Sequence, residues 1–421
     1  MDFPSKTTGK VLQCRHCQAP VTLEFCDLGA CPPTNSLIAP EREQEAERYW
    51  PLKTFVCTNC WLVQIDEMAS AEDIFNDEYV YYSSFSTSWV AHAKRYAEHM
   101  MERYQYGPES RVLEIASNDG YLLQWFVKAG VPVIGVDPTA NTAIAAKEKG
   151  VDTVTEFFGE KLAHETLLPQ GYAADLVCGC NVLAHVPDIN DFVKGIKAVL
   201  KPGGVCTIEF PHLMRLVEHT QFDTIYHEHY GYLSLVFVER LYKTFGLEIF
   251  EVQELPSHGG SLRIFARHAG DETKPMHESV ERIRNEEVRR GMTTEIYYKP
   301  FQQAVDQVKY DFWNWLIEQK RAGKKVAAYG AASKGVTLMN YAGYKGTDLI
   351  AFVSDANPHK QEKLLPGCRV PVRSPEAIAE YKPDYVVVLP WNLDREISQQ
   401  LAYIREWGGQ FVRFIPKLTV W

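Results

Sequence analysis

The sequence predicts an α/β protein in which a small cysteine-rich N-terminal domain precedes two Rossmann-like domains. Six of the ten cysteines lie within the first 60 residues, and two strand–turn–helix units follow, beginning near residues 111 and 326. With 421 residues the chain is also too long for one hydrophobic core. A hydrophobic content of 46% and a charged content of 23% are ordinary for a globular protein, and they exclude a collagenous or largely disordered chain.

The early cysteines predict a zinc site. Four of them form two Cys-x2-Cys pairs, which are Cys14 with Cys17 and Cys57 with Cys60. Two such pairs can supply four thiolates to one tetrahedral Zn(II). Buried free cysteines are the alternative interpretation, and His16, Cys26 and Cys31 are possible substitute ligands. Because a site closed by four thiolates has no open position for a substrate, the predicted zinc is structural.

Apolar periodicity predicts the elements of the central domain. In chain order they are a helix over 89–106, a strand over 111–116, a turn over 117–120, a helix, strands over 133–136 and 175–178, a helix through 192–200, the turn 201–204, a strand over 205–210, a helix over 235–245, and strands over 247–252 and 261–266. Ser234 can cap the last helix and Gly246 can end it.

A second, smaller α/β unit follows a helix-prone segment over 279–322. Its predicted strands cover 326–329, 349–353, 384–389 and 411–415, and a turn over 330–335 follows the first of them. We therefore expect domains over residues 1–82, 83–255 and 256–421.

The turn after the first central strand predicts a nucleoside-cofactor site, because small residues let backbone amides approach a ligand. A dinucleotide would require more glycines, and Glu114 and Asp119 would repel its diphosphate. The loop therefore favours S-adenosylmethionine, whose sulfonium is cationic, and Asp137 would bind two ribose hydroxyls. An ordinary turn without a ligand is the alternative, although the 201–204 turn and the two closing strands fit a class I methyltransferase. The candidate cofactor-binding residues are Glu114, Ser117, Asn118, Asp119, Gly120, Asp137 and Asn181.

Residues 222–232 form the densest titratable cluster of the chain, Phe-Asp-Thr-Ile-Tyr-His-Glu-His-Tyr-Gly-Tyr. The cluster lies between the carboxyl end of a strand and the next helix, where doubly wound sheets bind ligands, and this favours proton transfer. Metal binding by His227, Glu228 and His229 is the alternative, but three consecutive side chains cannot readily point at one ion. His185 would reach the same crevice or serve a structural role.

Further motifs follow in order along nearly the whole chain. They are the segment 79–84 with Trp89, the turn 117–120, and the segments 181–185, 226–229, 258–263 and 330–335. Together with the cysteine pairs they resemble the nucleotide-sugar C-methyltransferases of deoxysugar biosynthesis. The resemblance implies a zinc-binding N-terminal domain, a central S-adenosylmethionine domain and a C-terminal Rossmann-like domain that helps to hold a sugar nucleotide. It also implies catalytic roles for Tyr79, His185, Tyr226, Glu228 and His229. One departure, His227 at a position where an acidic residue is expected, leaves the sugar and the nucleotide base open.

Carbon methylation sets its own chemical requirement. A sugar carbon becomes a nucleophile only when a neighbouring ketone acidifies its C–H bond, and a 4-keto sugar meets this need. His229 would remove the C3 proton, and Tyr226 or Tyr79 would hydrogen-bond the developing enolate oxygen. Glu228 would orient or polarise the histidine. We therefore expect methyl transfer to C3 of an NDP-4-keto-6-deoxyhexose.

The second turn, 330–335, is interpreted as a phosphate cradle, and a purely structural turn is the alternative. Arg263 and Lys360 are further candidates for phosphate neutralisation, and a solvated cation is the alternative for each. The candidate substrate-binding residues are Tyr81, His258, Arg263, Gly330, Ser333 and Lys334.

Other functions compatible with these domains are a zinc-ribbon nucleic-acid-binding protein and an O- or N-methyltransferase. A net charge of -10 without a basic run disfavours nucleic acid. The sequence has no apolar stretch long enough to span a membrane and no secretory signal, so we expect a cytoplasmic enzyme without a membrane partner, either a monomer or a weak oligomer.

Overall fold

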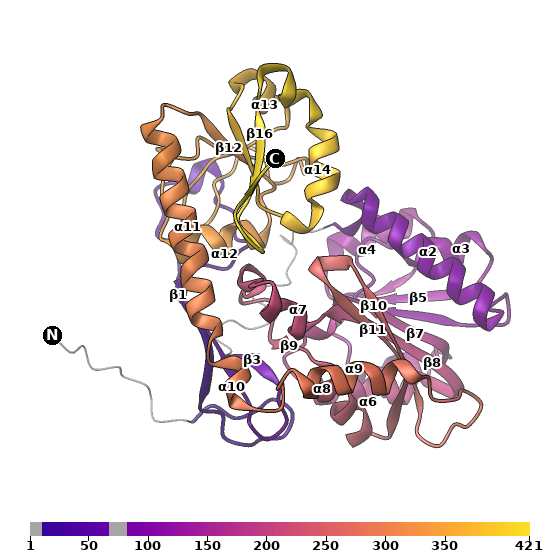
Figure 1. The fold of residues 1–421 in the computed structure, drawn as a ribbon. Coiled ribbons are helices and arrows are strands. Elements are labelled where there is room, and N and C mark those ends of the chain that lie inside the picture. The colour runs from indigo at the N-terminus through magenta and orange to yellow at the C-terminus, as the bar shows by residue number, and fades with distance from the viewer. Residues whose placement is uncertain (1–10, 67–81) are drawn as a thin grey trace.

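The computed structural model describes residues 11–66 and 82–421, in which three β-sheets form three packed lobes (Figure 1). The first sheet is antiparallel and has the order β1-β2-β3-β9. Its strands are β1 (Leu23–Cys31), β2 (Trp50–Val56), β3 (Val63–Ile65) and β9 (Gly231–Tyr232). Since β9 comes from the predicted titratable cluster, the N-terminal domain holds one end of that cluster directly.

The central sheet has seven strands in the order β10-β11-β8-β7-β4-β5-β6. They are β4 (Val112–Ile115), β5 (Val133–Val136), β6 (Thr153–Val154), β7 (Ala174–Cys180), β8 (Leu200–Pro211), β10 (Leu247–Leu255) and β11 (Ser261–His268). Neighbouring strands from β6 to β8 are parallel, and β11 runs antiparallel to both β8 and β10. This reversed strand beside a doubly wound sheet is the class I methyltransferase arrangement that the sequence predicts.

Helices cover both faces of the central sheet (Figure 1). Buried residues of α2 (Thr87–Tyr104), α3 (Leu123–Lys128) and α4 (Ala140–Glu148) form one hydrophobic core, and those of α6 (Ile189–Val199), α8 (Leu235–Thr244) and α9 (Glu278–Arg289) belong to another. The helix starts follow from capping side chains: Asp188 accepts from the amides of Asn190 and Asp191, and Ser234 accepts from the amide of Phe237.

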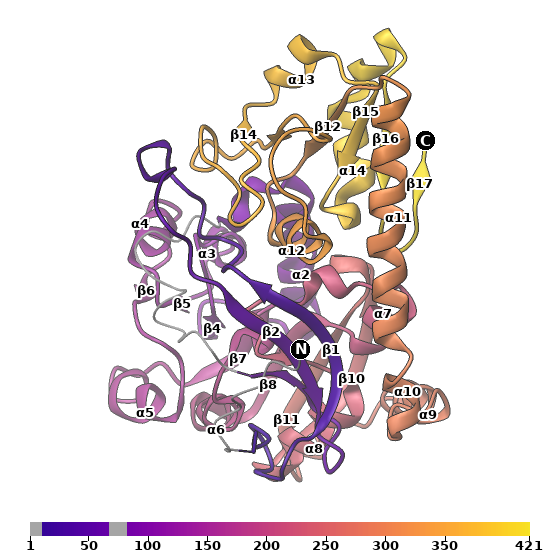
Figure 2. The same cartoon turned by 90° about the vertical axis from the view of Figure 1, so that its left-hand side faces the viewer.

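The C-terminal sheet has six strands in the order β14-β13-β12-β15-β16-β17. They are β12 (Val326–Tyr329), β13 (Val353–Ser354), β14 (Val372–Arg373), β15 (Tyr385–Val388), β16 (Gln410–Arg413) and β17 (Thr419–Val420), and the helices here are α11 (Phe301–Arg321), α12 (Ser333–Ala342), α13 (Glu376–Tyr381) and α14 (Asp394–Gln400). Figure 2 shows the N-terminal strands β1 and β2 running across the near face of the molecule, with α11 alongside β1. Phe25 of β1 stacks on Phe301 of α11 with ring centres 4.4 Å apart, within a core that the three lobes share.

Strand β11 lies beyond the expected domain boundary at residue 255 and pairs with β8 and β10 of the central sheet. Two predicted element bounds differ from the structure. Strand β8 begins at Leu200 and includes the predicted 201–204 turn. In the C-terminal domain, the predicted 349–353 strand is shorter because the amides of Leu349 and Ile350 donate to the hydroxyl of Tyr344 instead of to a neighbouring strand.

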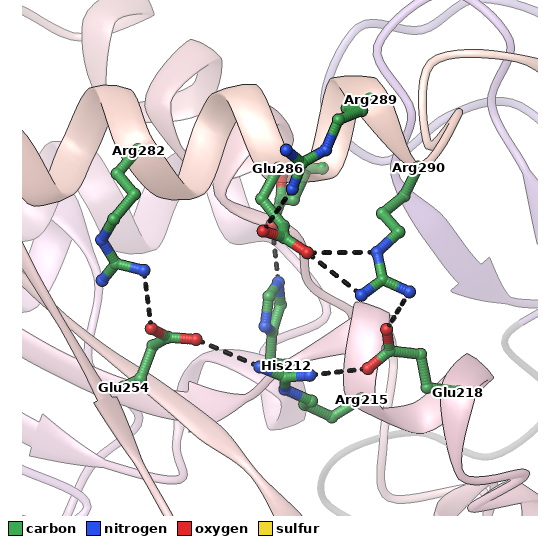
Figure 3. A network of polar contacts seen from close by, with 9 residues as sticks. His212, Arg215, Glu218, Glu254, Arg282, Glu286, Arg289 and Arg290 are labelled. Carbon is green, nitrogen blue, oxygen red and sulfur yellow. Dashed lines mark hydrogen bonds and ion pairs between the residues drawn. The ribbon is translucent and has the colours of Figure 1, made fainter.

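An ion-pair network joins α7 (Leu213–Glu218), β10 and α9 (Figure 3). Arg215 of α7 pairs with Glu218 at 2.7 Å and with Glu254 of β10 at 3.2 Å. Arg282 of α9 pairs with the same Glu254 at 3.0 Å, and Arg290 pairs with Glu218 at 2.6 Å. The network fixes the end of β10, from which the chain enters the 256–260 loop near the site. Within the described residues, no helix has the length and apolar character of a membrane span.

Candidate active site

Four cysteines of the N-terminal domain converge on one point. The Sγ atoms of Cys14, Cys17, Cys57 and Cys60 all lie within 4.8 Å of one another. The separations of 3.4 Å between Cys14 and Cys60 and of 3.6 Å between Cys17 and Cys57 are far longer than a disulfide bond of about 2.05 Å. Four such thiolates fit the tetrahedral site of a structural zinc ion.

The three substitute ligands do not reach this point. His16 directs Nδ1 to the side-chain oxygen of Asn190 at 2.8 Å. Cys26 and Cys31 lie outside the cluster, and burial raises the pKa of both thiols, that of Cys31 to about 12. These two cysteines are therefore buried core residues.

A cavity of about 310 Å³ opens at the carboxyl ends of the central strands. Its wall includes the aromatic side chains of Trp89, Tyr121, Phe158 and Phe192 and the acidic side chain of Asp137. A largely apolar cavity of this size with a few polar groups is typical of a small-molecule site. The lining fits the adenosine part of S-adenosylmethionine.

Three of the predicted cofactor residues line this cavity: Asn118, Asp137 and Asn181. Asp137 is held in place because its carboxylate accepts from the amide of Asn118 at 2.9 Å and from that of Thr139 at 3.0 Å. The Oδ1 atom of Asn181 is buried without a hydrogen-bond partner among the described atoms. It is therefore available to a bound ligand.

The other four predicted cofactor residues do not line the cavity. Glu114 is fully buried below it, and burial, followed by the charges of Asp137 and Asp119, raises its carboxyl pKa well above the usual range. Asp119 pairs with Lys149 at 3.0 Å, and Ser117 is fully buried. Gly120 has φ +74°, so it provides the left-handed residue that the turn requires.

Strained backbone occurs in the cavity wall. Four non-glycine residues there have positive φ: Ala116 at 58°, Asn118 at 46°, Asn181 at 57° and His258 at 53°. Such conformations are costly for residues with a Cβ, least so for Asn, and they recur at active sites and ligand-binding sites.

His229 carries the clearest catalytic geometry in the titratable cluster. Its Nδ1 lies 2.8 Å from the carbonyl oxygen of Thr224, so Nδ1 carries the proton and Nε2 carries the lone pair. Nε2 is buried and has no hydrogen-bond partner among the described atoms. Burial, followed by the neighbouring His185, lowers its pKa well below the usual value, which keeps the ring neutral. A neutral imidazole with a fixed tautomer and an unused lone pair can accept a proton from a substrate.

Two further histidines line the cavity, and one of them and a tyrosine pack against His229. His185 lines the cavity, and its ring meets that of His229 edge-on with centres 4.5 Å apart. His258 also lines the cavity, and its buried Nε2 has no partner among the described atoms. Burial lowers the pKa of both His185 and His258 to about 4. The Tyr226 ring lies 4.0 Å from that of His229.

Glu228 does not orient His229, contrary to the expectation. Its carboxylate accepts from Asn35 at 2.7 Å and from Thr34 at 3.4 Å, both in the N-terminal domain. The carbonyl of Thr224 orients the histidine instead. Burial raises the pKa of Glu228 to about 7.

Among the described residues, the cysteine cluster is the group that could hold a metal ion. The alternative of a metal bound by residues 227–229 is therefore not supported. His227 directs Nε2 to the carbonyl of Pro51 at 3.3 Å, and its ring meets that of Trp50 edge-on. The three consecutive side chains thus point to different partners.

An acid and a lysine meet where the C-terminal domain contacts the cluster. Asp223 is buried and accepts from the indole nitrogen of Trp391 at 2.7 Å, and burial raises its pKa to about 7. Burial lowers the pKa of Lys334, and the charge of Asp223 opposes that effect. The charge of Lys334 acts in turn on His229 and His258. Lys334 of the C-terminal domain thus lies within electrostatic range of these histidines.

Arg263 is already neutralised inside the protein. Its Nη2 lies 2.6 Å from Oε2 of Glu209, and His92 reaches the same oxygen at 2.9 Å. Burial alone would raise the pKa of Glu209, but the His92 hydrogen bond and the Arg263 charge outweigh it and lower the pKa to about 2. The arrangement supports a structural role for Arg263 rather than the expected phosphate contact.

The remaining substrate candidates have different surroundings. Gly330 has φ +91°, and a Cβ there would overlap the Pro390 ring, so packing explains this glycine. Ser333 begins α12, and Lys360 donates to the carbonyl of Ala331 at 2.8 Å. Tyr79 and Tyr81 lie outside the described residues.

Sequence reasoning missed part of the cavity wall. Residues 156–158 follow the two-residue strand β6 and contribute Phe157 and Phe158. These residues follow the carboxyl end of a strand, as Asp137 and Asn181 do, and that position would have identified them. Strand β6 has only two residues, however, which is too short for a hydrophobic periodicity to be detected in the sequence. A second hollow of about 360 Å³ lies beside the network of Figure 3, where Arg215 is already paired with two carboxylates.

The fold and the site together define a class I S-adenosylmethionine-dependent methyltransferase with an N-terminal zinc-binding domain. Family models described as a zinc binding domain, a methyltransferase domain and a C-methyltransferase C-terminal domain match residues 14–75, 89–252 and 256–416. The chain is 34% identical to the C-methyltransferase NovU of Streptomyces niveus, over 97% of this chain and 96% of that protein. The chain belongs to this C-methyltransferase family.

More distant similarities involve part of the chain. A ubiquinone biosynthesis O-methyltransferase of Bradyrhizobium sp. (strain ORS 278) is 35% identical over 23% of this chain and 38% of that protein. Among solved structures, the PH0226 protein of Pyrococcus horikoshii OT3 has 17% identity and a TM-score of 0.38, covering 45% of this chain and 95% of that chain.

Proposed function

We propose that this C-methyltransferase transfers a methyl group to C3 of an NDP-4-keto-6-deoxyhexose through an enolate formed by His229. The observation that carries the proposal is the buried Nε2 lone pair of His229, one ring away from the cofactor cavity. Methylation of a hydroxyl or amine does not require removal of a carbon-bound proton. A neutral, tautomer-fixed base meets this requirement of a carbon acid, and membership of the C-methyltransferase family favours carbon over oxygen or nitrogen as the acceptor.

Bound S-adenosylmethionine supplies an electrophilic methyl group on a sulfonium. The residues that would hold it are Asn118, Asp137 and Asn181, which line the cavity, and the ribose hydroxyls would meet Asp137. The 4-keto group of the sugar makes the C3 proton acidic enough for an imidazole to remove it.

In the proposed reaction, Nε2 of His229 accepts the C3 proton while Nδ1 stays bonded to Thr224. Tyr226, whose ring lies against His229, would donate a hydrogen bond to the enolate oxygen. Tyr79 is a second candidate for that role. His185 and His258 are neutral at physiological pH, since burial lowers both pKa values to about 4, so they would position the sugar without repelling a cationic cofactor.

Lys334 is our candidate cation for the sugar-nucleotide diphosphate or for the enolate, because its charge lowers the pKa of both His229 and His258. Arg263 pairs with Glu209, and Lys360 bonds a backbone carbonyl. We expect the enzyme to act in the cytoplasm on a free sugar nucleotide, as a monomer or weak oligomer, with no nucleic-acid partner.

The test is turnover with a panel of NDP-4-keto sugars and S-adenosylmethionine, read by mass spectrometry as the gain of one methylene unit. A substrate deuterated at C3 should also lose its label to water, and the exchange should stop in His229→Asn. His99→Asn on the exposed face of α2 is the matched control. A product methylated on oxygen or nitrogen, with the C3 label retained, would contradict the proposal.

A further inference from the structure

The residues between the first two zinc ligands reach from the zinc site to the active site. Arg15 donates from Nη1 to the carbonyl of Pro187 at 3.0 Å and from Nη2 to that of Ile65 at 3.4 Å. Its guanidinium carbon lies 5.0 Å from the centre of the Tyr230 ring. Arg15 therefore contacts the loop that follows β7 and the residue that follows His229.

His16 provides a second anchor for the same loop. Asn190 donates from Nδ2 to the carbonyl of His16 at 2.9 Å, and its Oδ1 lies 2.8 Å from His16 Nδ1. Because an amide oxygen only accepts, His16 Nδ1 carries the proton in this pair. Asn190 lies in the first turn of α6, and the cap of that helix, Asp188, lines the cofactor cavity.

The two loops are also bonded to each other. The amide of Tyr230 donates to the carbonyl of Ala184 at 2.7 Å, and the carbonyl of Tyr230 accepts from Ile65 at 3.2 Å. Strand β9 then pairs with β3, with Val63 opposite Tyr232. The segment that carries His229 is thus fixed at its far end to the sheet that holds the zinc ligands.

We propose that Arg15 is a positioning residue for methyl transfer, with His16 as its second anchor, and that the zinc knuckle thereby sets the placement of His185 and His229 at the cofactor cavity. The inference rests on the proposed role of His229 as base. Because both loops meet at Arg15, its loss should shift two catalytic side chains together. A displacement of about 1 Å at a reacting centre can reduce turnover about 100-fold.

The first measurement compares Arg15→Met, Arg15→Lys and the exposed control Arg48→Met for turnover of a sugar that the wild type accepts. We expect kcat of Arg15→Met to fall about 30- to 100-fold while the KM for the sugar changes little, and Arg15→Lys to recover part of the loss. Zinc content, and the number of S-adenosylhomocysteine molecules bound per chain, should equal those of the wild type. These two values separate misplacement from a smaller folded fraction, which would lower both.

The second measurement needs no sugar substrate. Amide hydrogen exchange, followed by mass spectrometry on the zinc-loaded protein, should become faster in peptides covering 184–190 and 226–232 of Arg15→Met, and should be unchanged there in Arg48→Met. If the wild type accepts no sugar of the panel, the proposed function fails, and the exchange data still decide whether Arg15 holds the two loops.

Two outcomes would overturn the inference. Unchanged exchange in both loops would show that Arg15 does not hold them. Faster exchange with an unchanged kcat would show that their placement does not matter for the reaction.

Discussion

His229 donates its Nδ1 hydrogen to the carbonyl oxygen of Thr224 over 2.8 Å, and this contact leaves Nε2 as a lone pair inside the protein. We expect His229→Asn to lower kcat about 100- to 10,000-fold, the range of a lost general base. Binding of S-adenosylhomocysteine, measured by calorimetry, should remain within a few-fold because the side chain does not line the cofactor cavity. A variant with wild-type turnover would remove His229 from the base role.

The charge of Lys334 gives a prediction for the pH dependence of catalysis. Burial lowers the pKa of His229 most, and the charges of His185 and Lys334 lower it further. The base works when neutral, so kcat/KM should fall only as the pH decreases through this lowered pKa. Lys334→Met removes one charge that favours the neutral ring, which raises the pKa of His229 and moves the acid limb of the pH–rate profile to higher pH. An acid limb that stays in place would show that Lys334 does not act on the base.

The raised pKa of Glu228 predicts that the stability of the protein depends on pH. Its pKa is about 7 in the folded protein and near 4.5 when exposed, so the folded state binds the proton more tightly. The native state therefore loses stability as the pH rises from about 4.5 to 7, by roughly 3 kcal/mol for this group.

Glu228→Gln should abolish this loss, because the amide oxygen still accepts from Asn35 and carries no charge. In urea unfolding the variant should be more stable than the wild type at pH 8 and not at pH 4.5. Since Thr224 rather than Glu228 orients His229, kcat should fall less than about tenfold. Equal stability differences at both pH values would exclude the raised pKa.

Local spacing predicted the parts of the site that depend on neighbours in sequence. The cysteine pairs and the strand ends at Asp137 and Asn181 lie in short segments whose geometry their own residues determine. Side-chain direction was harder to predict, because it alternates along a strand: Glu114 is buried in the core, and only Asn118 of the turn after it lines the cavity. Pairs distant in sequence, such as Asp223 with Trp391 and Glu228 with Asn35, leave no local pattern.

Loss of the ion pair between Arg263 and Glu209 should have a large effect on stability and a small effect on substrate binding. Both side chains are buried, and removal of one partner leaves an uncompensated charge, which costs about 3–5 kcal/mol. Arg263→Met and Glu209→Gln should each lower the free energy of unfolding by about this amount, and the double variant should lose less than the sum. The KM for the sugar nucleotide should change less than about threefold in Arg263→Met. A larger rise in KM with intact stability would assign Arg263 to the phosphates.

Removal of zinc should affect the active site as well as the N-terminal domain. The metal holds Cys14 and Cys17 beside Cys57 and Cys60, and the free energy of zinc binding is also folding free energy for the segments that it joins. Between these ligands the chain forms β1 and β2, and β3 follows directly and pairs with the strand beyond His229. A chelator strong enough to remove zinc should therefore lower the melting temperature and abolish methyl transfer, although the cofactor cavity lies in another domain.

The matched control is Cys368→Ser, which changes a buried cysteine outside the cluster, compared with Cys57→Ser within it. Cys57→Ser should reduce zinc below one equivalent per chain and lose activity in the same proportion, whereas Cys368→Ser should keep its zinc. If zinc-free protein still turned over at the wild-type rate, the pairing of β3 with β9 would be able to hold the catalytic segment without the metal. Zinc binding would then make no contribution to catalysis.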